Sequence, residues 1–201
     1  MNTLDIPRLT QYDILPAALI NQFPWPENDY RPRAEARAAW TPDALHFWLT
    51  AWEAEPLTRF FEHQSPVYTD SCLEFFLNAC PDAGRRYLNF EFNSAGSLLL
   101  YIGDSRYSRK SLKPAELGRL KIRAGQQLDD EPRWQIACVV PLDLLEDHFG
   151  HLAWGPGLVM AGNFYKCGDQ TAQPHCACWN PITASKPDFH RPEDFGRLIL
   201  T

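Results

Sequence analysis

The sequence predicts an all-β protein, an antiparallel β-sandwich of jelly-roll or immunoglobulin-like layers with short helical excursions. Three observations support this fold class. The 17 Pro and 11 Gly are scattered along 201 residues, so they interrupt long helices and supply turns. Several short segments alternate between apolar and polar side chains, and aromatic residues make up 13% of the chain, which suits a heavily packed core or exposed stacking platforms. We expect residues 1–201 to form one domain around one core.

The first half of the chain contains five segments with strand character. They cover residues 35–40, 45–52, 72–77, 87–93 and 97–102. The clearest is 87–93, in which Leu88, Phe90 and Phe92 alternate with Asn89, Glu91 and Asn93. A Ser-Ala-Gly turn follows it, so we expect a hairpin with the next strand and a polar face that carries these three residues.

The second half begins with a polar, basic excursion at residues 105–127, in which we expect only a short helix near 114–120. Strand character returns afterwards, and a short helix or turn is expected at 142–149. The later expected strands are residues 134–141, 157–167, 177–179 and 195–200.

The charge balance excludes two classes of partner. Nineteen Lys and Arg against 25 Asp and Glu give a net charge of -6, the wrong sign for binding nucleic acid or anionic membranes.

The first residues, MNTLDIPRLTQYDILP, lack a basic run followed by an apolar stretch, so we expect a cytoplasmic protein, or a secreted one if a leader is removed from a longer precursor. The six Cys are too sparse for a disulfide scaffold, and we expect mostly reduced thiols.

Three segments carry motifs in a definite order. In the first segment, Tyr68 precedes a D-x-x-x-E-x-F-L pattern that runs from Asp70 to Leu77. The second segment covers residues 162–169. In the third, Trp179-Asn180 is followed by the F-G-x-L of residues 195–198. As an ordered set, these motifs resemble the family 9 carbohydrate-binding modules, especially the stand-alone bacterial proteins with a DOMON-like sandwich. The resemblance runs from about residue 35 to the end of the chain.

This resemblance implies a non-catalytic, glycoside hydrolase-associated module that takes part in polysaccharide or oligosaccharide breakdown. The end of a mono- or oligosaccharide would stack between aromatic side chains, while polar groups bind its hydroxyls. By position, Tyr68 and Trp179 are the expected stacking pair and Glu74 a polar contact. Tyr stands where the family commonly has Trp, which predicts weaker stacking. Four further candidates come from their chemistry as amides or cations near these segments: Asn163, Lys166, Asn180 and Arg106.

Structural interpretations of the same residues remain open. Tyr68 and Trp179 could both be core aromatics, and Glu74 a solvated carboxylate on a strand face. Residues 187–193 could form a lip over the ligand or a rigid loop that leads into the last strand. The alternative function is that of a divergent cytosolic β-sandwich with a changed ligand or a role in protein interaction.

Other chemistries were weighed and are less favoured. Cys167, His175, Cys176 and Cys178 offer zinc ligands, but their spacing lacks a C-x2-4-C pair, so we predict small buried thiols and no metal site. Asp70, Glu74 and Glu91 could serve a glycoside hydrolase, but no catalytic motif accompanies them, so no catalytic residue is predicted. Met160 with His175 could hold haem, and calcium occurs in some family members, but no oxygen-rich loop is present and no cofactor is predicted.

Overall fold

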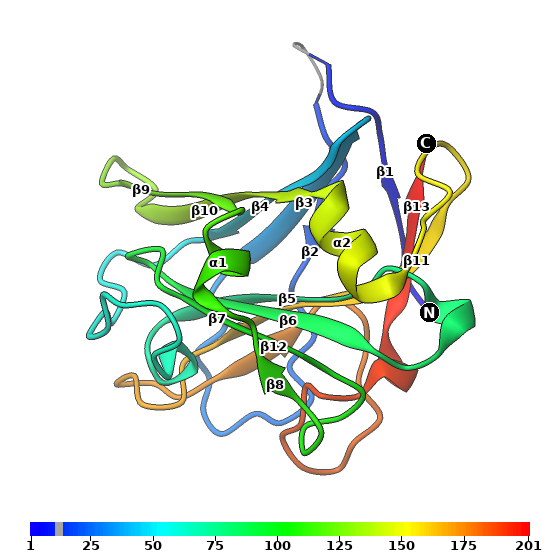
Figure 1. Ribbon diagram of the computed structural model, residues 1–201. Coiled ribbons are helices and arrows are strands. Elements are labelled where there is room, and N and C mark those ends of the chain that lie inside the picture. The colour runs from blue at the N-terminus through cyan, green and yellow to red at the C-terminus, as the bar shows by residue number, and fades with distance from the viewer. Residues whose placement is uncertain (11–13) are drawn as a thin grey trace.

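Two β-sheets pack face to face in the computed structural model, which describes residues 1–10 and 14–201 (Figure 1). Within these residues the larger sheet has the order β1-β13-β11-β5-β6-β7-β8, and β12 also pairs with β11. Its strands run antiparallel except for the parallel pair of β1 and β13. The bounds are β1 Thr3–Ile6, β5 Cys72–Asn78, β6 Tyr87–Asn93, β7 Leu98–Gly103, β8 Lys110–Ser111, β11 Val159–Cys167, β12 Cys176–Cys178 and β13 Gly196–Leu200.

The smaller sheet has the order β2-β3-β4-β10-β9, and its neighbouring strands are antiparallel. The helix α2 (Leu142–Phe149) lies beside the gap between the two sheets, and α1 (Pro114–Leu117) lies near β7 (Figure 1). The strand bounds are β2 Ala18–Leu19, β3 Ala34–Thr41, β4 Ala44–Ala51, β9 Lys121–Gln127 and β10 Arg133–Pro141. This arrangement confirms the predicted antiparallel β-sandwich.

The main core fills the space between the sheets. Phe47 of β4 meets Phe75 of β5 and Phe90 of β6 edge to face, with ring centroids 5.1 and 5.6 Å apart. All three side chains are fully buried, because alternate residues of each strand point to the same face. Edge-to-face rings of this kind add to the free energy gained by burial of apolar area. Part of the aromatic surplus therefore belongs to the sandwich core.

Most of the expected strands and the helix at 142–149 are confirmed, but the excursion at 105–127 contains more structure than predicted. The short helix α1 is present and ends at Leu117, and β9 occupies residues Lys121–Gln127. Among the residues that the structure describes, the edge strand β9 pairs with β10 alone, and most of its side chains are exposed. A strand with two solvated faces needs no apolar alternation, so the sequence pattern did not reveal it. Within the described residues, no helix is long and apolar enough to span a membrane.

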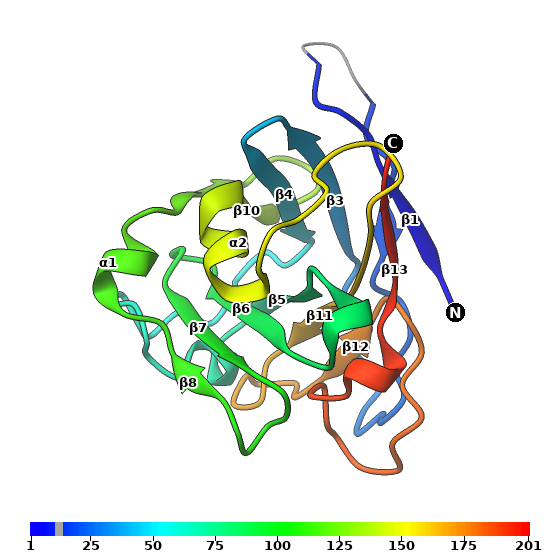
Figure 2. The ribbon, with the colours of Figure 1, turned by 45° about the vertical axis from the view of Figure 1, so that its right-hand side comes forward.

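The outer face of the larger sheet, which points away from β3 and β4, is also covered. Phe76, Tyr87, Tyr165 and Phe195 form a second, smaller core there. The turn after β7 and the long segment between β12 and β13 project on this side (Figure 2). An ion pair joins them, since Arg106 Nη2 lies 3.0 Å from Asp188 Oδ1. Beside the small core these segments leave a polar hollow, which is the candidate site.

Candidate functional site

A cavity of about 270 Å³ opens on the outer face of the larger sheet. Its floor comes from five neighbouring strands, β7, β6, β5, β11 and β12, which contribute Leu99, Glu91, Glu74, Cys167 and Cys176. Loops supply the walls, with Trp25, Tyr68, Arg106, Arg109, Asp169 and residues 187–190. Rigid strands therefore carry the polar floor, and loops from distant parts of the sequence carry the aromatic walls.

Three aromatic side chains line the walls. Tyr68 is 39% exposed, whereas its neighbours Val67 and Thr69 in the same short 3-10 helix are buried and anchor it. Phe189 stacks on Tyr165, with ring centroids 4.1 Å apart and planes 9° from parallel, and Trp25 packs at a tilt against Phe189. The indole of Trp25 is fixed by a hydrogen bond that its Nε1 donates to Ala184 O at 2.8 Å. These side chains are held in place before any ligand arrives.

Two carboxyl groups lie side by side on the floor. Glu74 of β5 and Glu91 of β6 are partners in the antiparallel register, and both residues are buried. Burial, with smaller opposing effects of Arg109 and Asn89, raises the pKa of Glu91 to about 7. Burial and the neighbouring Glu91 raise the pKa of Glu74 well above its usual value. Both shifts favour the protonated carboxyl, which can donate as well as accept a hydrogen bond.

Two arginines border this carboxyl pair. Arg109 Nη1 donates to Asn89 Oδ1 at 3.1 Å and lies 3.7 Å from Glu91 Oε1. Asn89 Nδ2 in turn donates to Glu91 Oε1 at 2.9 Å, so the three side chains form a connected polar network. Arg106 bonds Asp188 across the mouth of the cavity. Charged groups already held by hydrogen bonds lose little conformational entropy when a ligand binds.

His190 closes one end of the wall as a neutral ring. Burial, followed by the charges of Arg109 and Arg106, lowers its pKa to about 2. Its Nδ1 accepts a hydrogen bond from the Tyr87 hydroxyl at 2.9 Å, which the unprotonated nitrogen allows. The loop at 187–193 has two parts with different contacts. Residues 187–190 line the cavity, whereas Arg191 pairs with Asp194 at 2.8 Å and fixes the entry into β13.

The comparisons with known proteins place the chain in a family. The sequence model of carbohydrate-binding family 9 matches residues 5–200. The chain belongs to carbohydrate-binding family 9. The resemblance expected from the motifs is therefore confirmed, and family 9 consists of non-catalytic binding modules. No curated protein sequence matches the chain.

Solved structures share the fold of this chain. A "putative carbohydrate-binding protein" from Bacteroides uniformis has a TM-score of 0.85 and 27% identity, over 99% of both chains. A family 9 module from Caldicellulosiruptor kristjanssonii in complex with glucose has a TM-score of 0.67 and 12% identity, over 100% of this chain and 96% of that one. Its complex with cellotriose gives the same TM-score and identity, with coverage of 99% and 93%. At 12% identity the likeness to the Caldicellulosiruptor module shows the fold alone.

The candidate site differs from the sequence-based expectation at Trp179. This side chain is 6% exposed, belongs to the main core and meets Phe164 edge to face at 5.7 Å. Gly196 lies directly under its ring, so that a Cβ placed there would be 2.5 Å from Trp179 Cζ3. Trp179 therefore does not line the cavity, and the expected stacking pair with Tyr68 does not form. The core interpretation applies to Trp179, and Trp25 and Phe189 are the aromatic side chains that accompany Tyr68.

Two predicted amide contacts also lie outside the cavity. Asn163 and Asn180 are both buried, and the Asn163 side chain binds the backbone of Asn180. Asn163 Oδ1 accepts from the Asn180 backbone N–H at 2.8 Å, and Asn163 Nδ2 donates to Asn180 O at 3.0 Å. Asn180 also donates to Asp194 O and accepts from the backbone N–H of Asn2. These amides satisfy buried backbone groups where β1, β11 and β13 meet, so they stabilise the fold and are not free to bind a ligand.

Lys166 points away from the cavity, into the space between the sheets. Its ammonium is fully buried and lies 2.8 Å from His175 Nε2 and 3.2 Å from Glu53 Oε2. Burial and this ammonium lower the pKa of His175 to about 4, so the neutral ring accepts from Lys166 and donates from Nδ1 to Gln173 O. His175 thus has a structural partner. Of the four residues considered as zinc ligands, Cys167 and Cys176 line the cavity, whereas His175 and Cys178 do not. Met160, the candidate haem ligand, is a core residue.

Tyr68, Glu74 and Arg106 are the predicted ligand contacts that the structure brings together around one cavity. The solvated interpretation of Glu74 is wrong, because its residue is 3% exposed. Trp25 and Arg109 are pocket residues that the sequence did not predict. Phe189 entered only as part of the possible lip at residues 187–193, and Glu91 only as a hydrolase carboxylate. The alternation of 87–93 did place Glu91 on the polar face of its strand. Trp25 and Phe189 sit in irregular segments, where no periodicity marks the direction of a side chain.

Proposed function

We propose that this family 9 chain binds the end of a saccharide in the cavity on the outer face of the larger sheet, without catalysis. The observation that carries the proposal is the combination in one hollow of aromatic walls with a floor of hydrogen-bonding groups. Pyranose rings present C–H groups on their faces and hydroxyls at their edges, so a sugar needs both. Tyr68 supplies an apolar face, and the Glu74 and Glu91 pair with Arg109 supplies donors and acceptors.

The size of the cavity limits the ligand. About 270 Å³ lies below the range of roughly 300–1,000 Å³ that is typical of pockets for larger ligands. One pyranose ring or the terminal residue of an oligosaccharide suits this volume. The Caldicellulosiruptor module that shares this fold was solved with glucose and with cellotriose, which makes a glucose-ended chain the first ligand to test. The family resemblance extends the proposal to a role in the breakdown of such saccharides.

The carboxyl pair favours binding over hydrolysis. The two carboxyls of a glycosidase flank the scissile bond from both sides of the sugar. Glu74 and Glu91 instead stand next to each other on adjacent strands of one floor. Asp70, the third carboxylate weighed for catalysis, accepts hydrogen bonds from the Arg59 backbone N–H and side chain, both at 2.8 Å. It holds a loop and does not line the cavity.

Isothermal titration calorimetry with glucose, xylose, cellobiose and cellotriose tests the proposal. Reductant and a metal chelator are present throughout, and the ligands reach high millimolar concentrations because weak affinity is expected. We expect saturable binding that Tyr68→Ala weakens about tenfold, corresponding to about 1.4 kcal/mol. Tyr107→Ala is the matched control, because Tyr107 is 94% exposed and does not line the cavity. A folded protein that binds none of these sugars would favour a changed ligand, and equal affinities for both variants would exclude Tyr68 from the site.

A further inference from the structure

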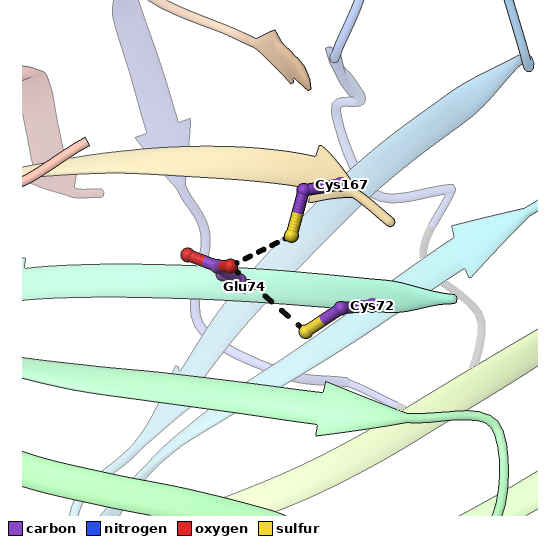
Figure 3. Close-up of side chains that lie close together, drawn as sticks. All are labelled: Cys72, Glu74 and Cys167. Atoms are coloured by element: carbon purple, nitrogen blue, oxygen red, sulfur yellow. Dashed lines mark hydrogen bonds between the residues drawn. The ribbon is translucent and has the colours of Figure 1, made fainter. Parts of the chain in front are cut away.

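Two thiols and a carboxyl group converge at the floor of the cavity, where Glu74 and Cys167 line the hollow and Cys72 is fully buried. Cys72 and Glu74 are two residues apart on β5 and point to the same face, and Cys167 of β11 is the register partner of Cys72. Figure 3 shows the Glu74 carboxyl between the two sulfurs. Cys167 Sγ lies 3.0 Å from Glu74 Oε1 and Cys72 Sγ lies 3.9 Å from it, and ligand atoms of all three residues lie within 4.8 Å of one another.

These separations fit one metal ion of a particular kind. Zinc binds thiolate sulfur at about 2.3 Å and carboxylate oxygen at about 2.0–2.2 Å, so neighbouring ligand atoms of a zinc tetrahedron are about 3.5–3.8 Å apart. The two sulfur–oxygen distances, 3.0 and 3.9 Å, lie on either side of that range. Small side-chain rotations therefore suffice, and the strands that carry the ligands stay in register. Thiolates favour zinc over calcium or magnesium, which prefer oxygen ligands.

We propose that Cys72, Glu74 and Cys167 form a Zn²⁺ site in the floor of the cavity, with the fourth coordination position open toward the cavity. Three protein ligands and one open position are the arrangement in which zinc can also contact a small ligand. Glu74 and Cys167 line the cavity, so the open position faces its interior. Binding of Zn²⁺ releases the protons of both thiols and any proton on Glu74, and the ion takes their place.

The surroundings of this zinc site support the proposal in two ways. Besides Glu74, the thiols of Cys72 and Cys167 contact each other, as two ligands of one metal ion would. Their remaining contacts among the described residues are with backbone carbonyls at 3.9 and 3.8 Å. Two thiolates, one carboxylate and Zn²⁺ leave one negative charge, which the guanidinium groups of Arg106 and Arg109 in the same cavity offset. Cys176, the register partner of Cys167 on its other side, also lines the cavity, so the fourth ligand can be a water or a further thiolate.

Metal titration of the full chain tests this site. The protein is reduced, stripped of metal with a chelator and desalted, and Zn²⁺ is then added in competition with a chromophoric chelator, without saccharide. We expect one Zn²⁺ per chain. With Co²⁺ as the probe we expect thiolate-to-cobalt charge transfer and the intense visible bands of a tetrahedral site. Cys72→Ser and Cys167→Ser should each weaken Zn²⁺ binding at least about 100-fold, because each removes one of three ligands.

The matched control is Cys80→Ser, a partly exposed thiol outside the cluster, which should bind Zn²⁺ as the wild type does. Circular dichroism verifies that each variant is folded, and loss of the cobalt charge-transfer band in folded Cys72→Ser and Cys167→Ser assigns the site to these two thiols. A reduced, folded wild type with no charge-transfer band overturns the site, as does undiminished Zn²⁺ binding by Cys72→Ser and Cys167→Ser. The inference goes beyond saccharide binding. Because the sugar titrations contain chelator and the metal titrations contain no sugar, either result can fail without the other.

Discussion

The buried ammonium of Lys166 lies 3.2 Å from the carboxylate of Glu53 in the space between the two sheets. Glu53 Oε2 also accepts a hydrogen bond from Trp134 Nε1 of β10 at 2.8 Å. One carboxylate thus connects β11 of the larger sheet with β10 of the smaller sheet. The attraction of Lys166 and these hydrogen bonds outweigh the cost of burial and lower the pKa of Glu53. Lys166 therefore holds the sheets together behind the cavity floor and does not contact a ligand.

Replacement of Lys166 by methionine should destabilise the fold strongly. Lys166→Met leaves the Glu53 carboxylate buried without its ionic partner, a change that typically costs about 3–5 kcal/mol. Urea unfolding at neutral pH measures the loss. The double variant Lys166→Met/Glu53→Gln should recover part of it, because it removes the unpaired charge as well. If the double variant is less stable than Lys166→Met, the buried charge is not the source of the loss.

Tyr68 and Trp179 should respond to alanine in opposite ways. Trp179→Ala removes a buried core side chain and should cost about 3–5 kcal/mol of unfolding free energy, while the folded fraction keeps its saccharide affinity. Tyr68→Ala removes a partly exposed side chain, so stability should change little while affinity falls. Calorimetric titration and urea unfolding of both variants separate the two effects. A loss of affinity in folded Trp179→Ala would instead support the interpretation that Tyr68 and Trp179 form a stacking pair around the ligand.

The alternation of apolar and polar residues predicted most of the sheet and part of the site. It placed Glu91 on the polar face of its strand, and the D-x-x-x-E motif identified Glu74. The same alternation puts the side chains of Lys166 and Cys167 on opposite faces of the sheet. The prediction that Lys166 contacts the ligand used only its position near the motifs, which does not distinguish the two faces. The two carboxyls become neighbours only through the register of β5 and β6, which a single sequence does not specify.

Trp179 illustrates a different limit. A tryptophan before an asparagine fits both a stacking platform and a core aromatic, and the choice depends on what lies against the ring. Here Gly196, 17 residues later, leaves room for the ring inside the core. The pocket aromatics Trp25 and Phe189 come from irregular segments more than 160 residues apart and meet through tertiary packing. Local sequence patterns do not predict such tertiary contacts between distant segments.

Protonation of His190 should oppose folding in acid. Its pKa is about 2 in the folded protein and about 6.5 in the unfolded chain, so below pH 6.5 the unfolded state binds more protons. The contribution of the neutral ring is present above pH 6.5 and is lost progressively as the pH falls toward about 2. The charges of Arg109 and Arg106 add to the effect of burial on the ring. The Tyr87 hydroxyl donates to the ring Nδ1, and the Asp188 carboxylate accepts from the backbone N–H of His190.

His190→Gln should therefore flatten the acid side of the stability profile. Urea unfolding in a series of buffers from neutral to acid pH measures the slope of unfolding free energy against pH. His151→Gln provides the matched control, because the side chain of His151 is 90% exposed. An unchanged slope in folded His190→Gln would show that other groups dominate acid unfolding.

The contact between Gly196 and Trp179 explains why a glycine follows Phe195 in the terminal motif. A methyl group at Gly196 would lie 2.5 and 2.8 Å from two carbons of the Trp179 ring and 3.0 Å from Asn2 O. The ring is enclosed by the core and the backbone oxygen belongs to the strand-pairing segment, so neither can move freely. Gly196→Ala should cost about 1–3 kcal/mol, as overpacking of a filled core does.

Gly125→Ala is the matched control, because a Cβ at Gly125 on the exposed edge strand β9 meets nothing within 4 Å. Its stability should be unchanged or slightly higher, since alanine restricts the unfolded chain more than glycine does. Urea unfolding of the two variants gives the comparison. In the background Trp179→Phe, whose smaller ring leaves space, Gly196→Ala should cost less than in the wild type. An equal cost in both backgrounds would assign the effect to the Asn2 carbonyl and not to the ring.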